Sequence, residues 1–281
     1  MKDERHDPDL DVELLWRPRR GLDLERIVHA AVEVADEDGL EGMSMRKVAE
    51  RLGFTPMSLY RHVPGRDQLI DLMLDGAMAR LPDPPTEGDW RSRLETCLTQ
   101  GWELTRRHPW LAEARGTRRL PGPNTVARYE RMLAILADTS LPPAEVIAAL
   151  NVVSRFVDAE ATALLEAARA ERDGGGTDEE WWDARRSLFD QLDAHPTITA
   201  LWEAGGWDDP VDTFTFGLAR LLDGLEARIK THEQLRDEMR DENCRVCGTP
   251  IDQPDSGRRR RYCSRACQQR AYRQGRSDRE Q

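Results

Sequence analysis

The sequence lacks both a long apolar segment and a secretory signal. No run of about 18 apolar residues occurs in its 281 positions, so no segment is long enough to cross a bilayer as a helix. The first nine residues, Met-Lys-Asp-Glu-Arg-His-Asp-Pro-Asp, are polar and acidic, unlike a signal peptide. We therefore expect a cytoplasmic protein without membrane contact, whose five cysteines stay reduced.

The patterns that accompany catalysis are also missing. No glycine-rich phosphate loop follows a strand pattern, and no Ser/His/Asp or paired-carboxylate arrangement stands out. His195 and His232 are isolated, which favours structural or surface roles. We therefore expect that the protein is not an enzyme.

Tyrosine and phenylalanine are scarce, with four and five copies, and glycine-turn repeats are absent. With 33% charged and 39% hydrophobic residues, this composition predicts an all-α protein with substantial apolar cores. The length is sufficient for roughly two domains.

Positive charge is scarce overall but concentrated in two places. The chain carries a net charge of −11, whereas residues 44–66 carry five basic residues against Glu50, a local net of +4. Residues 256–281 hold nine arginines against Asp278 and Glu280, a net of +7, so the other 255 residues carry −18. An acidic body with two basic islands is typical of a protein that binds nucleic acid locally.

Residues 44–66 predict two short helices joined at a glycine. Ser44 is a favourable N-cap, Gly53 can adopt the positive φ of a tight turn, and Thr55 can cap a second helix that starts at Pro56. The apolar positions at helical spacing are Val48, Ala49, Leu52, Leu59 and Val63. This pattern is a helix-turn-helix, whose second helix enters the DNA major groove.

The strings Met-Arg-Lys-Val-Ala-Glu-Arg-Leu-Gly and Thr-Pro-Met-Ser-Leu-Tyr-Arg-His-Val resemble the tetracycline-repressor (TetR) family of bacterial regulators. Trp90-Arg-Ser, and Phe216-Gly-Leu-Ala-Arg-Leu-Leu-Asp-Gly-Leu-Glu, resemble the C-terminal domain of the tetracycline repressors themselves. The resemblance covers about residues 22–232. It implies a homodimer that binds double-stranded operator DNA and is released by a small-molecule inducer.

The resemblance also assigns DNA contacts position by position. Tyr60, His62 and Arg66 are expected to touch phosphates. Base edges or nearby backbone are expected to be reached by Arg46, Thr55, Met57, Ser58 and Arg61, with Ser44 at the start of the first helix. Pro56-Met57 replaces a more polar pair in the tetracycline repressors, which leaves the base read there open.

Helical periodicity and breaks divide the chain into four parts. These are a flexible N-terminal arm (1–21), a DNA-binding domain (22–68), a ligand-binding and dimerisation domain (69–238) and a cysteine-containing basic tail (240–281). Helices are predicted at 24–39, 67–81 with Asp67 as a cap, 90–107, 123–138, 143–170, 181–194 and 210–235, with a loop at 171–180. The basic residues of the arm can reach a minor groove or remain solvated.

The long helices at 143–170 and 210–235 are apolar on more than one face. They can meet a dimer mate, as the resemblance implies, or be buried within one chain. A ligand cavity is expected among Trp102, Trp110, Tyr129, Phe156 and Trp202, with Trp207 as a further aromatic candidate. The family's drug- and magnesium-binding histidines fall near Pro82 and Arg115, which leaves magnesium-bound tetracycline without its ligands and the inducer unknown.

Four of the five cysteines lie close together near the end of the sequence. Cys244 and Cys247, and then Cys263 and Cys267, form two pairs separated by fifteen residues. This spacing predicts a structural Zn²⁺ site with four thiolates. The neighbouring arginines can contact phosphate near the operator, dock an acidic protein or stay solvated. Cys97 lies in an apolar helix and is expected to be a core thiol.

Three functions remain open from the sequence. The first is a transcriptional repressor released by a small-molecule inducer, and the second is a zinc- or redox-responsive regulator that senses through the four tail cysteines. The third is an enzyme with a regulator-like head. The aromatic cavity expected without reactive groups favours the first over the third.

Overall fold

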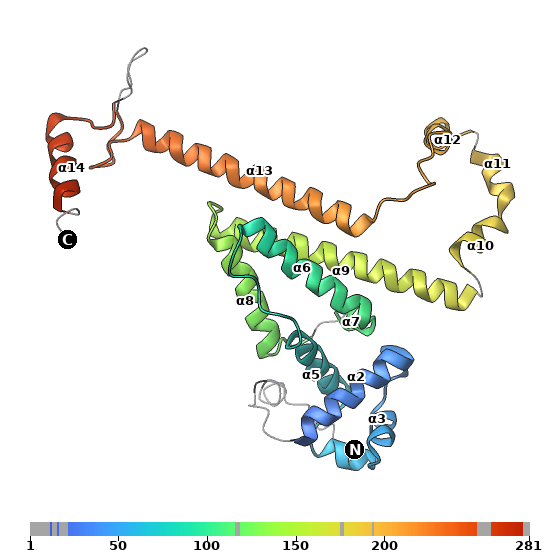
Figure 1. The fold of residues 1–281 in the computed structure, drawn as a ribbon. Coiled ribbons are helices and arrows are strands. Elements are labelled where there is room, and N and C mark those ends of the chain that lie inside the picture. The colour runs from blue at the N-terminus through green and yellow to red at the C-terminus, as the bar shows by residue number, and fades with distance from the viewer. Residues whose placement is uncertain are drawn as a thin grey trace, which may run out of the picture.

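Figure 1 shows a computed structural model, which describes Val12, Trp16 and residues 22–115, 119–174, 177–192, 194–251 and 260–277. The expected arm at 1–21 therefore lies outside the described residues apart from Val12 and Trp16. The described residues are helical, and the only β-type pairing among them is an isolated antiparallel bridge between Asn243 and Pro250. The all-α expectation is confirmed. None of the described helices is both long enough and apolar enough to cross a membrane.

The head is built from four helices at the lower end of the molecule (Figure 1). They are α2 (Leu22–Gly42), α3 (Met45–Leu52), α4 (Pro56–Tyr60) and α5 (Arg66–Met78). The N-cap prediction for α3 is confirmed, because the Ser44 hydroxyl accepts from the Lys47 amide at 3.3 Å. Gly53 adopts a φ of 73°, which closes the turn into α4. Leu59 and Val63 are buried beneath that turn.

Three local predictions in the head differ from the structure. Thr55 occupies the N-cap position of α4 as predicted, but its hydroxyl pairs with the Ser58 hydroxyl at 3.1 Å and caps no backbone amide. Gly65 occupies the N-cap of α5, so Asp67 lies inside the first turn. The helix predicted at 24–39 extends to Gly42, with a non-helical residue at Gly39. These differences arise because caps depend on side-chain rotamers and on neighbouring helices.

The expected boundary between 68 and 69 falls inside α5. Leu69, Ile70 and Met73 of α5 lie in the core beneath α2 and α3, together with Trp110 and Leu111 from the next domain. A single helix therefore runs from the DNA-binding head into the body, and residues of the body complete the core of the head.

The body packs four long helices around a second core. They are α6 (Trp90–Arg107), α8 (Pro123–Ala137), α9 (Pro143–Gly174) and α13 (Thr213–Glu242), with the short α7 (Trp110–Arg115) leading back to the head. In Figure 1, α13 and α9 run alongside each other across the top of the body. The shared core residues include Leu94, Leu136, Leu150, Val153, Leu218 and Leu222.

The segment between α9 and α13, which is yellow in Figure 1, extends away from the body. We call this segment the arm from here on; it is distinct from the N-terminal arm predicted at 1–21. It contains α10 (Asp178–Asp183), the 3₁₀ turn η1 (Arg186–Leu188), α11 (Phe189–Leu192) and α12 (Pro196–Glu203). The single helix predicted at 181–194 is therefore wrong, because short turns break it. The loop predicted at 171–180 is also shorter than expected, since α9 continues to Gly174 and α10 starts at Asp178.

Candidate nucleic-acid interface and metal centre

The outward surface of α4 carries the side chains expected to meet DNA. Met57 is 73% exposed and Tyr60 is 47% exposed, and Arg61 and His62 also face solvent. Leu59, between them, is buried and fixes the face that α4 turns inward. Arg61 donates to the Ser58 hydroxyl at 3.4 Å. This polar surface on a short, firmly anchored helix is suited to groove reading.

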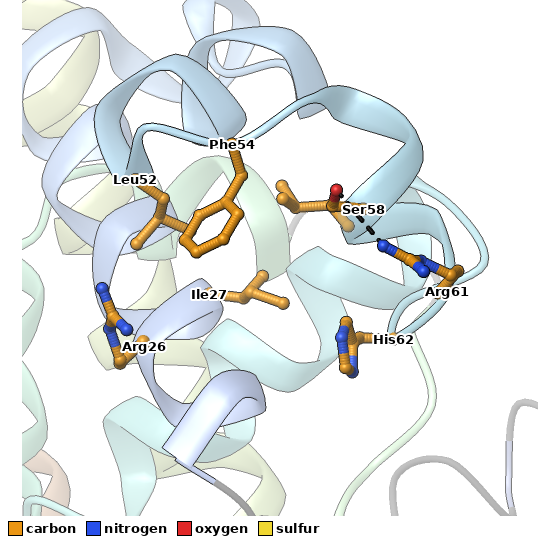
Figure 2. A pocket seen from close by; sticks show the side chains of 8 residues that line it. Arg26, Ile27, Leu52, Phe54, Ser58, Arg61 and His62 are labelled. Atoms are coloured by element: carbon orange, nitrogen blue, oxygen red, sulfur yellow. Dashed lines mark hydrogen bonds between the residues drawn. The ribbon is translucent and has the colours of Figure 1, made fainter.

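A cavity of about 260 Å³ opens between α2 and α4 (Figure 2). Its lining combines apolar Ile27, Leu52 and Phe54 with the polar ends of Arg26 and His62. Phe54 is 54% exposed although it is a large apolar residue. Neither Phe54 nor Arg26 was identified from the sequence, because their proximity depends on how α2 crosses the helix-turn-helix.

The basic residues of α3 are already paired within the head. Lys47 contacts Asp38 at 2.8 Å, Arg46 contacts Glu50 at 2.7 Å, and Arg51 forms ion pairs with Glu37 and Glu33. The Arg51 guanidinium lowers the pKa of the Glu37 carboxyl. The local charge of +4 counted over 44–66 is therefore offset by acids on α2. Arg61 is the cation of that stretch that lies on the outward surface of α4.

Arg66 has a structural role in this conformation. Its guanidinium donates to the carbonyl oxygens of Met43, at 3.0 Å, and of Leu40. The Met43 carbonyl lies just beyond the end of α2, and the Leu40 carbonyl also accepts from the Met43 amide at 3.3 Å, so Arg66 ties the end of α2 to the start of α5. A phosphate contact by Arg66 must therefore share its donors with these carbonyls.

Two polar clasps join the head to the body. Asp75 on α5 is fully buried and accepts from the amides of Asn124 and Thr125 at 2.9 and 3.0 Å, and from both their side chains. These amides open α8, so Asp75 caps a helix that belongs to another part of the chain. A Cβ on Gly122 would lie 2.4 Å from the Asp75 carboxyl carbon, which explains the glycine.

The second clasp lies between α2 and α7. One oxygen of Asp36 accepts from the Trp110 indole at 2.8 Å and lies 2.8 Å from Nδ1 of His108. Trp110 is almost fully buried in the core shared with the head. Trp110 therefore lies at the junction between the head and the body.

The five residues expected to line a ligand cavity do not converge. Trp102 stacks on Phe214 with ring centroids 4.5 Å apart, and Phe156 stacks on the same ring at 6.1 Å. Tyr129 is partly exposed on α8, Trp110 lies at the head junction, and Trp202 is 54% exposed on the arm beside Trp207. Phe214, which joins Trp102 to Phe156, was missed because its partners are far away in sequence.

A close helix approach supports this aromatic stack. A Cβ on Gly217 would lie 2.4 Å from the tip of the Phe156 ring. Only glycine therefore lets the Phe156 side chain lie against the α13 backbone at this position. The stack brings α6, α9 and α13 together in the middle of the body.

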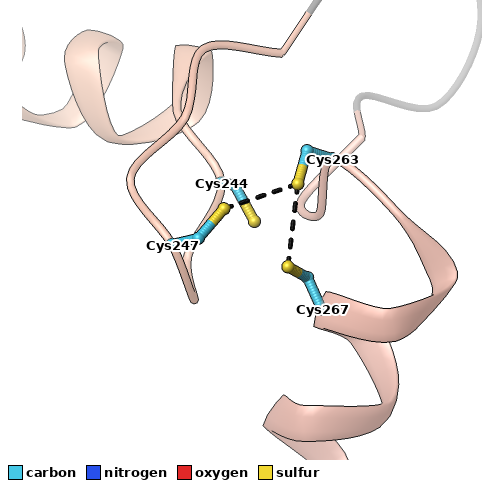
Figure 3. A group of neighbouring side chains, drawn as sticks. All are labelled: Cys244, Cys247, Cys263 and Cys267. Carbon is cyan, nitrogen blue, oxygen red and sulfur yellow. Dashed lines mark hydrogen bonds between the residues drawn. The ribbon is translucent and has the colours of Figure 1, made fainter.

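The four tail cysteines meet as their spacing predicts (Figure 3). Their sulfur atoms all lie within 4.8 Å of one another, and those of Cys247–Cys263 and Cys263–Cys267 are 3.4 and 3.7 Å apart. Four thiolates at 2.3 Å from a tetrahedral zinc lie roughly 3.8 Å apart. The donor set and its dimensions therefore fit this metal.

The surrounding backbone orients the four thiols. The Gly248 amide donates to the Cys244 carbonyl at 2.8 Å, and Gly248 adopts a φ of 71°, which makes the tight turn around the first pair. The second pair lies at the start of α14 (Arg265–Ser277), where the Ser264 hydroxyl accepts from the Cys267 amide. Backbone hydrogen bonds, chiefly to the amide of Cys263, lower the pKa of Cys244 to about 6.

Comparisons with known proteins cover both the head and the body. A family model described as "Bacterial regulatory proteins, tetR family" matches residues 27–73. A second, described as "Tetracyclin repressor-like, C-terminal domain", matches residues 81–229. Residues 230–281, which include the cysteine cluster, lie beyond both matches.

Two proteins that are similar to this chain are transcriptional repressors. The HTH-type transcriptional repressor DrrR1 of Streptomyces coeruleorubidus is 40% identical over 231 residues, which span 78% of this chain and 85% of the relative. The class A tetracycline repressor from transposon 1721 of Escherichia coli is 27% identical, over 72% of this chain and 89% of the repressor.

A solved relative has the same fold. ActR of Streptomyces coelicolor in complex with actinorhodin is 27% identical with a TM-score of 0.60, and the match covers 73% of this chain and 96% of ActR. Apo ActR is 28% identical with a TM-score of 0.59 and covers 74% and 98% of the two chains. With both family models matched and a repressor at 40% identity, this chain belongs to the TetR family of bacterial transcriptional regulators.

Proposed function

We propose that this protein represses transcription by holding operator DNA through its head, and that a small molecule bound in the body releases it. The observation that carries the proposal is α5, which runs from the head core into the body and is clasped there by α8. The repressor DrrR1 supports the DNA-binding half of the proposal. The complex of ActR with actinorhodin supports the ligand-binding half.

DNA recognition is assigned to α4 and its flanks. Thr55, Met57, Ser58 and Arg61 reach base edges or adjacent backbone, while Tyr60 and His62 contact phosphates. Arg46 also contacts DNA, for which it must leave Glu50. This is feasible because their ion pair is exposed and therefore weak in water. Ser44 and Arg66 act mainly by fixing the ends of α3 and α2.

We assign the ligand-binding site to the aromatic stack of Trp102 and Phe156 around Phe214. Tyr129 on the adjacent α8 is part of the same assignment. Flat aromatic surfaces of this kind favour a small molecule with an apolar face. Trp110 is assigned to signal transmission, because its indole is bonded to Asp36 of the head. Trp202 is assigned to the contact with a second copy.

Release requires a ligand that prefers one arrangement of the heads over the other. A shift of α8 is transmitted to α5 through Asp75, and a shift of α6 and α7 is transmitted to α2 through Asp36. Two heads on successive major grooves must stand roughly 34–36 Å apart. A ligand-bound conformation with another separation binds the operator less tightly.

The proposal requires a homodimer, and the surface of the single chain supports one. Trp181, Trp182, Trp202 and Trp207 are each between 42% and 54% exposed on the arm, and Phe216 at the start of α13 is 56% exposed. So many exposed large apolar residues on neighbouring segments are typical of a protein interface. A second copy of this chain is the partner we assign to them, since a palindromic operator requires two-fold symmetry.

We also propose that the tail holds one structural Zn²⁺ through Cys244, Cys247, Cys263 and Cys267. The four sulfur atoms within 4.8 Å and the tight turn at Gly248 support it. Thiolate ligands select zinc among the common divalent metals. Bound there, the ion cross-links the two halves of the tail, and its four protein ligands leave no open position for a substrate.

The test of repression uses an operator selected from random duplexes with the full-length protein. Arg61→Ala is expected to weaken operator binding by about 1–3 kcal/mol and to relax specificity at one base position. Arg236→Ala, an exposed cation on α13, is the matched control and is expected to bind as the parent does. If both variants bind with parental affinity and specificity, α4 is not the recognition helix.

The alternative regulator senses zinc or oxidants through the same four cysteines. The observation that favours it is that Cys247 and Cys263 are exposed with their sulfur atoms 3.4 Å apart. Its response depends on the tail, whereas the response of the leading proposal depends on the body.

A further inference from the structure

The basic end of the chain has a surface that the functions assigned above leave unused. Residues 260–277 contain six arginines and no aspartate or glutamate, in a chain whose net charge is −11. The net positive charge of the segment is a reason to look for an anionic partner.

The cysteine cluster determines which side of α14 faces outward. Cys267 is buried toward the cluster, and Ala271, four residues later, is half-buried on the same side. Arg265, Gln269 and Tyr272 follow at helical spacing on the opposite side and are exposed, with Tyr272 at 76%. Exposed Arg261 precedes the helix, and its carbonyl accepts from the Arg245 amide at 3.2 Å.

We call Arg261, Arg265, Gln269 and Tyr272 the tail face. Guanidinium groups bind phosphate oxygens in a fixed fork geometry, and an amide and a phenol add further hydrogen bonds to a phosphate backbone. An acidic protein surface would also attract arginines. Nucleic acid is favoured because Gln269 and Tyr272 supply neutral donors beside the cations, and because a DNA regulator works amid concentrated phosphate.

The position of the tail face separates it from the operator contact. α13 contains 30 residues, which correspond to about 45 Å of helix, and it packs on α6 and α9 before it reaches the tail. In Figure 1 the tail and the head lie at opposite ends of the protomer. The expectation that the tail adds phosphate contacts near the operator is therefore replaced by contact with another stretch of DNA.

We propose that the tail face is a second DNA-binding site, which holds a duplex segment distinct from the operator held by the head. The proposal rests on the proposed zinc site, because the metal is what holds the tail face in shape. Binding is electrostatic and independent of base sequence. A dimer bound to its operator can thereby bridge to a second duplex.

The experiment uses the full-length protein loaded with zinc on an immobilised operator duplex, with a labelled 20-base-pair duplex of unrelated sequence as the probe. The parent is expected to capture the probe, and Arg261→Gln with Arg265→Gln is expected to abolish most capture. The dependence of log affinity for the probe on log salt should flatten by roughly 0.9 for each phosphate that the variant no longer neutralises. The matched control, Arg106→Gln with Arg236→Gln, removes the same charge from exposed positions of α6 and α13.

Operator affinity and zinc content are measured on the same samples. If the protein holds one zinc per chain but captures no probe, the second DNA site is overturned and the zinc site stands. The same conclusion follows if the tail variant captures as much probe as the parent. Equal loss in the control variant also overturns the second DNA site, because the effect is then one of net charge. Assembly of the parent into larger oligomers without capture shows that the tail face binds another copy. Less than about half an equivalent of zinc contradicts the zinc site itself, and persistence of capture in that sample overturns the dependence on metal.

Discussion

At the scale of single residues, Asp75 shows how one buried carboxylate joins two parts of the molecule. It lies on the helix that leaves the head, and four donors at the start of α8 surround it. The first amides of α8 have no partner within their own helix and are half-buried, so Asp75 supplies their hydrogen bonds. Gly122 leaves room for it, since a Cβ there would overlap its carboxyl group.

Asp75→Asn is expected to destabilise the fold by about 1–3 kcal/mol, because the new amide places a donor opposite the Asn124 side-chain amide. Denaturant unfolding measures the change. Asp67→Asn, on the same helix, is the control. Asp67 is exposed, so its ion pair with Arg119 contributes at most about 1 kcal/mol to stability. Equal effects of the two substitutions would contradict the role given to the buried clasp.

At the scale of elements, the tail is the part with the least apolar support. Its core consists of Cys244, Ile251 and Cys267, with Val246 and Tyr262 packed against them. So small a cluster cannot offset the conformational entropy of the segment without a cross-link. A metal held by four thiolates supplies that cross-link, and its binding free energy becomes folding free energy for the tail.

Cys263→Ser is therefore expected to lower zinc below about half an equivalent and to raise amide hydrogen exchange across α14, with the body unchanged. Metal analysis and hydrogen exchange by mass spectrometry give the two readouts. Cys97→Ala removes the buried cysteine of α6 and should retain one zinc per chain. Full protection of α14 in the zinc-free variant would show that the tail folds without metal.

At the scale of the whole molecule, the two candidate regulators differ in where the response originates. α13 ends at Glu242, so removing residues 243–281 leaves every helix of the head and body intact. If a ligand in the body controls the operator, the shortened protein should bind the operator within about twofold of the parent and release it with the same ligand. Gel shifts with the host's small-molecule extract measure both properties.

The same truncation identifies the alternative. A response to zinc depletion or mild oxidant that disappears with residues 243–281 assigns sensing to the cysteines. A shortened protein that responds to neither the extract nor oxidant, while the parent responds to the extract, contradicts a ligand site confined to the body.

Features that depend on near neighbours could be predicted from the sequence alone. Ser44, Gly53 and the apolar spacing of α3 and α4 specify the helix-turn-helix because caps, turns and helical periodicity act over a few residues. The spacing of the four cysteines likewise indicates a common site, since two short turns bring each pair together. The ends of the body helix at 90 and 107 were also predicted correctly from local signals.

Which distant residues meet depended on the tertiary structure. It paired Lys47 and Arg51 with acids of α2, turned Arg66 toward backbone carbonyls, and divided the five expected ligand residues among the stack, the head junction, α8 and the arm. It also placed the basic tail far from the head. The physical reason is that local propensities specify helices but not how they cross, and the crossings determine which side chains touch.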